Sequence, residues 1–139
     1  MSAVPGAGAL VKGAVLEPRT FSVTRADLVR YAGASGDFNP IHWSERVATS
    51  VGLPGVIAHG MFTMALAARA VADWTDGAEV VELGCKFTQP VVVPDDEDGV
   101  EVVVGASVKE VADGLATLAL EVTCGGTKVL GMPRAVVRA

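Results

Sequence analysis

The residues best suited to chemistry are a carboxylate, an amide and an imidazole that lie within six residues of one another: Asp37, Asn39 and His42. A separation of five places side chains about 140° apart on a helix and on opposite faces of a strand, so regular structure would keep Asp37 and His42 apart. Pro40 fixes its own φ and moves Asn39 out of the helical region, which predicts an irregular turn that brings the two together. A carboxylate beside an imidazole fixes its tautomer and tunes its basicity near neutral pH. We predict that His42 is a base and Asp37 its partner, although each residue alone is typical of an ordinary turn.

A second histidine ends the same region, directly before an apolar run. Gly60, which follows His59, can open a helix whose N-terminal N–H groups attract negative charge. His59 is a second catalytic group, a metal ligand or an anchor of the loop against the helix, and we favour the anchor. Two histidines and a carboxylate also match a non-haem iron site, but such sites need a rigid sheet scaffold, whereas one histidine here lies on a loop and the other at a helix entry. We predict no metal.

The composition excludes two classes of ligand. The net charge is −5 and the 11 lysines and arginines are scattered, whereas nucleic-acid backbones are bound by clustered positive charge. The longest apolar run, residues 61–72, is interrupted by Arg69 and falls far short of the roughly 20 residues that span a bilayer. We therefore expect a protein that binds neither nucleic acid nor membrane and that works in the cytoplasm.

A chain of 139 residues fits one domain. Residues 1–13 are rich in alanine and glycine and lack the pattern of a secretion signal, so we expect a flexible tail there and a single domain over residues 14–139. Apolar residues make up 50% of the chain and charged residues 19%, and part of this apolar excess should be covered by another subunit. We expect an oligomer.

Hydrophobic periodicity changes from helical to strand-like along the chain. Residues 60–74 are apolar on nearly every side, which predicts a helix that is buried all round. Asp113-Gly114 and Gly125-Gly126 are hairpin signals between strand-like runs, and they predict an antiparallel meander. Strands are expected at residues 15–23, on a sheet edge because of Pro18, and at 80–93, 100–109, 115–123 and 127–137. This order predicts an α+β fold in which an antiparallel sheet wraps around a central apolar helix.

Two of these segments, Gly36–His42 and Ile57–Met61, resemble the hydratase-2 motif of the MaoC-like (R)-specific enoyl hydratases and dehydratases. The likeness continues through Phe87–Val91 and the closing strands, so it covers nearly the whole chain. The sequence around both histidines is most similar to that of the catalytic β subunits of the actinobacterial (3R)-hydroxyacyl-ACP dehydratases.

The resemblance implies a hot-dog fold that pairs with a second such unit, with the site at their interface. It implies a hydro-lyase that interconverts (3R)-3-hydroxyacyl and trans-2-enoyl thioesters in fatty-acid or mycolic-acid-type elongation, with no metal or redox cofactor. Asp37 and His42 would form the catalytic pair, and Asn39 would position them. Gly60 would offer its backbone N–H to the thioester carbonyl, with His59 in support.

Several alternatives stay open at this point. The acyl group could be carried by coenzyme A or by an acyl carrier protein, and the second unit could be an identical chain or a related one. A hot-dog acyl thioesterase and a non-catalytic acyl-binding subunit are the competing functions. The intact set of Asp37, Asn39 and His42 speaks against the non-catalytic subunit, because a scaffold does not need it.

Overall fold

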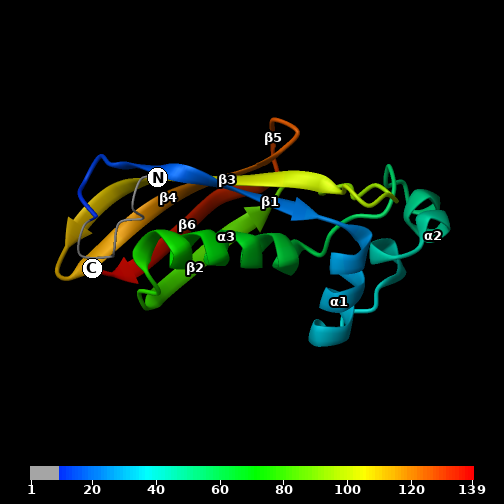
Figure 1. Ribbon diagram of the computed structural model, residues 1–139, viewed down its shortest axis with the longest axis horizontal. Helices are drawn as coiled ribbons and strands as arrows, with labels where there is room; N and C mark the ends of the chain where they lie inside the picture. Colours follow the sequence, from blue (N-terminus) through cyan, green and yellow to red (C-terminus); the bar gives the residue numbers. More distant parts are fainter. Residues whose placement is uncertain (1–9) are drawn as a thin grey trace.

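The computed structural model describes residues 10–139, which form a strongly curved antiparallel sheet with one long helix along its inner face (Figure 1). The elements in chain order are β1 (Val15–Val23), α1 (Arg25–Ser35), a 3-10 turn η2 (Pro40–His42), α2 (Glu45–Ser50), α3 (Gly60–Thr75), β2 (Val80–Phe87), β3 (Val100–Ala112), β4 (Leu115–Cys124), β5 (Thr127–Lys128) and β6 (Leu130–Arg138).

The strands run in the order β1-β3-β4-β6-β2, and the short β5 pairs with β4. The expected meander is confirmed, because β3 pairs with β4 and β4 with β6, and the turns fall at Asp113-Gly114 and at Gly125-Gly126. All four turn residues have positive φ, the backbone conformation that such two-residue hairpins require. β1 lies at a sheet edge as expected, and its register shifts between Leu16 and Arg19, around Pro18.

Helix α3 packs its buried face against the sheet and supplies much of the core. It runs over Gly60–Thr75, within one residue of the expected helix. Trp74 is 2% exposed, and its indole N–H donates to the Glu17 carbonyl of β1 at 2.7 Å. Inward-facing valines and alanines of β3 and β4 complete this core. The predicted α+β arrangement of a sheet around a central helix is confirmed.

The expectation that this helix is buried all round was wrong. Met61 is 56% exposed, and Ala65 and Arg69 are exposed one and two turns further along the same face. A sheet that curves around a helix covers only the side that faces it, so this stripe is left outside the core of the chain.

Two boundaries also differ from expectation. The strand expected over residues 80–93 ends at Phe87, because Pro90 has no N–H for a ladder and the chain turns away as a loop. In the expected tail, residues 1–9 lie outside the described residues, but Leu10 is 5% exposed and Gly13 N–H donates to the Val108 carbonyl at 2.8 Å. The described part of that segment is therefore packed, and the domain starts no later than Leu10. Within residues 10–139, no helix has the length and hydropathy needed to cross a membrane.

Candidate active site

The turn that carries the predicted pair begins where α1 ends. Thr24 and Asp27 form a reciprocal capping box at the start of α1, which fixes that end of the helix. At the other end Gly36 adopts φ +77° and its N–H donates to the Ala32 carbonyl at 2.9 Å. This left-handed residue, which favours glycine, stops the helix and directs the chain into the turn at Asp37.

Short-range hydrogen bonds shape this turn. Asn39 N–H donates to Asp37 Oδ1 at 3.1 Å, which holds the carboxylate over the turn. The Asn39 side-chain Oδ1 in turn accepts from Ile41 N–H at 3.2 Å and so caps η2, with Pro40 at its first position. Asn39 thus orients both members of the pair, through its backbone at Asp37 and through its side chain at the turn that carries His42.

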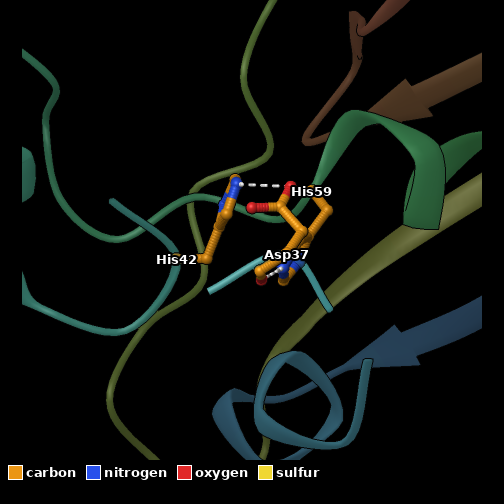
Figure 2. Close-up of side chains that lie close together, drawn as sticks. All are labelled: Asp37, His42 and His59. Carbon is orange, nitrogen blue, oxygen red and sulfur yellow. Dashed lines mark hydrogen bonds and ion pairs between the residues drawn. The ribbon is translucent and has the colours of Figure 1, made fainter. Parts of the chain in front are cut away.

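His42 is held by a carbonyl on one side of its ring. Its Nδ1 lies 2.7 Å from the Ile57 carbonyl oxygen, and because a carbonyl can only accept, Nδ1 carries the proton. In the neutral ring Nε2 is therefore unprotonated and carries a lone pair. This nitrogen lies 3.9 Å from Asp37 Oδ2 (Figure 2). The His42 side chain is 8% exposed and that of Asp37 52%. The structure brings the predicted pair together with the basic nitrogen facing the carboxylate.

The Ile57 carbonyl is fixed by a short strand-like pairing between loops. Ala58 N–H donates to the Val91 carbonyl and Val93 N–H to the Val56 carbonyl, both at 2.9 Å. Ile57 N–H donates to the Ile41 carbonyl at 3.2 Å. The segment before α3 is therefore joined both to the loop after β2 and to the turn that carries His42.

His59 connects the same parts from the other side. Its Nε2–H donates to the Asp37 carbonyl at 3.0 Å, and its ring stacks on that of His42 with centroids 3.8 Å apart and planes inclined by 21° (Figure 2). Tyr31 packs edge-on against it. Its Nδ1 is the one buried side-chain nitrogen or oxygen within residues 10–139 that lacks a hydrogen-bond partner. These contacts fit the anchor interpretation of His59.

A cavity of about 470 Å³ opens beside the pair at the start of α3. Gly60 and Met61 line it, and within the described residues their N–H groups donate to no backbone carbonyl, as expected for the first turn of a helix. The walls also include residues that the sequence did not indicate as site residues: Thr63, Phe87, Gln89, Val129 and Leu130. The phenyl ring of Phe87 lies 3.0 Å from where a Cβ on Gly60 would stand.

Comparison with known protein families shows which family this chain belongs to. A family model described as a MaoC like domain matches residues 7–123. The chain belongs to the MaoC-like domain family. Over 73 residues this MaoC-like chain is 42% identical to the 3-hydroxyacyl-thioester dehydratase X of Mycobacterium tuberculosis, an alignment that covers 52% of the chain and 25% of that protein.

Solved structures show the same fold. A structure described as a MaoC-like dehydratase superimposes with a TM-score of 0.89 at 33% identity, over 98% of this chain and 42% of that one. The R-hydratase PhaJ1 from Pseudomonas aeruginosa gives a TM-score of 0.82 at 26% identity, over 98% of this chain and 86% of that one. The predicted hot-dog fold is confirmed. The MaoC-like chain spans about a quarter of the mycobacterial relative and less than half of the first structure.

Burial lowers the pKa of His42 below its ordinary value of 6.5, because a charged ring would lose its hydration in this site. The hydrogen bond to Ile57 opposes this shift, His59 adds to it, and the Asp37 carboxylate opposes it. The folded chain therefore takes up this proton at a lower pH than the unfolded chain. As the pH falls below about 6.5, His42 makes a growing unfavourable contribution to stability.

The ligand atoms of Asp37, His42 and His59 lie within 4.8 Å of one another, but the two imidazole rings are not directed towards one common ion. His42 and His59 have one nitrogen free each, and the lone pairs lie in the planes of two nearly parallel rings 3.8 Å apart. An ion about 2.0–2.1 Å from both nitrogens could not lie in both planes. The geometry thus supports the sequence-based expectation of a metal-free site, which stays a prediction.

The titration of His42 should report this environment directly. We expect its ring to titrate below pH 6.5 and the pKa to fall further in Asp37→Asn, because the carboxylate favours the charged ring. Two-dimensional NMR of the imidazole carbons can follow this, since the chain has only two histidines. A His42 pKa that stays the same or rises in Asp37→Asn would contradict the described contact.

Proposed function

We propose that this chain is an (R)-specific hydro-lyase that interconverts (3R)-3-hydroxyacyl and trans-2-enoyl thioesters. The observation that carries the proposal is the neutral His42 Nε2, 3.9 Å from the Asp37 carboxylate and beside a cavity that opens onto the first turn of α3. The similarity to a 3-hydroxyacyl-thioester dehydratase and to an R-hydratase supports it. The chemistry requires proton transfer at two neighbouring carbons, and the pair supplies two groups for it.

In the dehydration direction, His42 Nε2 takes a proton from the carbon next to the thioester. Asp37 gives a proton to the 3-hydroxyl as its C–O bond breaks, so water leaves and a carbon–carbon double bond forms, and the His42 imidazolium then returns a proton to Asp37. His42 can begin this step because its lowered pKa keeps the ring neutral near pH 7. The reverse path adds water, with Asp37 taking its proton and the His42 imidazolium protonating the carbon.

Negative charge gathers on the thioester carbonyl oxygen during either step. We propose that Gly60 N–H, free at the positive end of α3, donates to that oxygen. The charged carbonyl oxygen is then stabilised by a donor, Gly60 N–H, that is already in position. Asn39 positions the pair and His59 supports it, and none of these steps calls for a metal or redox cofactor.

The substrate class follows from the cavity. Its walls are largely apolar, which suits an acyl chain. The carrier of the acyl group is coenzyme A or an acyl carrier protein. The process that we infer is fatty-acid elongation or elongation of the mycolic-acid type. The names of the relatives favour a thioester substrate.

Hydration of crotonyl-CoA tests the proposal. We expect loss of enoyl-thioester absorbance with the purified chain and about a 1000-fold lower rate in Asp37→Asn and in His42→Gln, because each loses a proton-transfer group. Asp95→Asn, in the exposed loop between β2 and β3, is the matched control and should keep the rate. Circular dichroism should show an unchanged fold in all three.

The same preparation distinguishes the competing functions. Ellman's reagent detects the thiol that a thioesterase would release from an acyl-CoA, and a non-catalytic subunit would show neither reaction. Full activity in both Asp37→Asn and His42→Gln would contradict the mechanism.

Gly60→Ala tests the location of the thioester. Gly60 has no positive φ, so its backbone accepts alanine, but the new Cβ would stand 3.0 Å from the Phe87 ring and displace it into the cavity. We expect about a 100-fold lower rate at nearly unchanged stability, since Phe87 is 56% exposed and free to move. Adding Phe87→Leu should recover part of the rate. Full activity of Gly60→Ala alone would place the substrate elsewhere.

We further propose that a second hot-dog unit, identical or related, covers the rim of this site. Met61 and Phe87 line the cavity and are each 56% exposed. Phe38 and Trp43, the chain neighbours of Asp37 and His42, are 61% and 55% exposed. Exposed large apolar side chains are typical of an interaction surface where they form a patch. Light scattering should give at least twice the 14.2 kDa of one chain, alone or with a co-expressed related subunit. A chain that is fully active at 14.2 kDa would contradict the pairing.

A further inference from the structure

Thr63 of α3 is a buried polar residue beside the Asp37–His42 pair, and the mechanism proposed above gives it no role. Thr63 is 3% exposed and lines the cavity. Its hydroxyl makes no hydrogen bond with any residue in the described part of the chain, and it is not among the atoms sealed from solvent there, so it faces the cavity. The hydroxyl is therefore available to hydrogen-bond a ligand in the cavity.

A second threonine of the same helix provides an internal comparison. Thr75 is 2% exposed, and its hydroxyl donates to the Val71 carbonyl at 2.8 Å and accepts from Ala78 N–H at 3.2 Å. This is the usual way in which a helical threonine satisfies its hydroxyl. Thr63 does not bond back to the His59 carbonyl, which accepts from the backbone N–H of Thr63 instead.

The position of Thr63 in the helix directs it towards the oxyanion donor. Side chains of an α-helix lean towards its N-terminus and cover the turn before their own Cα. Thr63 lies three residues after Gly60, which places both on the same face, and the turn that it covers is the one with free N–H groups at Gly60 and Met61. All three residues line the cavity.

We propose that the Thr63 hydroxyl is a second hydrogen-bond donor to the thioester carbonyl oxygen, beside Gly60 N–H. This inference rests on the proposed function, because it assigns the substrate atom that the hydroxyl meets. The hydrogen bond strengthens as the oxygen gains charge, so it acts mainly on the transition state. No proton is transferred by Thr63.

Thr63→Val removes the hydroxyl and keeps the branched shape, whereas Thr63→Ser keeps the hydroxyl. We expect Thr63→Val to lower kcat for crotonyl-CoA hydration about 100-fold with a nearly unchanged KM, and Thr63→Ser to stay close to wild type. Thr63→Val should be at least as thermally stable as wild type, because its hydroxyl has no partner to lose. Thr75→Val, the matched control, should lower Tm and leave kcat unchanged.

A binding measurement separates this role from a structural one. Polarisation of the carbonyl shifts the absorbance of bound cinnamoyl-CoA to longer wavelength, and Thr63→Val should reduce that shift while Thr75→Val should not. If wild type hydrates crotonyl-CoA but Thr63→Val matches it in kcat and in the absorbance shift, the second donor is refuted and the proposed function stands. If wild type fails to hydrate any enoyl thioester, the proposed function itself is refuted. A Thr63→Val variant that loses kcat only together with Tm would also overturn the assignment.

Discussion

The hydrogen bond from His42 Nδ1–H to the Ile57 carbonyl is the interaction on which the site depends. At 2.7 Å it fixes the tautomer of a buried ring, and only that tautomer leaves the Nε2 lone pair facing Asp37. The carbonyl is itself fixed by backbone pairing with the loop after β2. The basicity of one nitrogen therefore depends on backbone contacts between segments more than 30 residues apart, and disturbing that pairing would change this basicity without altering the side chain of Asp37 or of His42.

Much of the fold and of the turn over residues 37–42 could be predicted because the signals are local. The hairpin turns lie at Asp113-Gly114 and Gly125-Gly126 because positive φ is needed there, and Pro40 with Asn39 makes the bend that brings Asp37 and His42 together. Helix α3 was found within one residue from its apolar run. In each case the information lies within a few residues of the feature.

The rest depends on long-range packing, which the sequence does not display. Phe87 reaches Gly60 because β2 crosses to the far edge of the sheet beside β6, a pairing that no short motif encodes. His42 stacks on His59, which follows a segment, residues 56–58, that pairs with residues 91–93 far along the chain. The exposed stripe of α3 was missed because the helix is apolar nearly all round, and only the curvature of the sheet decides which side is covered.

The site combines two environments that oppose each other electrostatically. Burial makes a charged His42 unfavourable, whereas the free N–H groups at the start of α3 favour negative charge in the same cavity. Under the proposed mechanism these two environments act together: a carbon loses its proton to His42 while the adjacent carbonyl oxygen gains charge, so the charged ring forms together with an anion nearby. The buried Nδ1 of His59, which has no hydrogen-bond partner, lowers the stability of the folded chain. The packed core of the sheet and α3 offsets that cost.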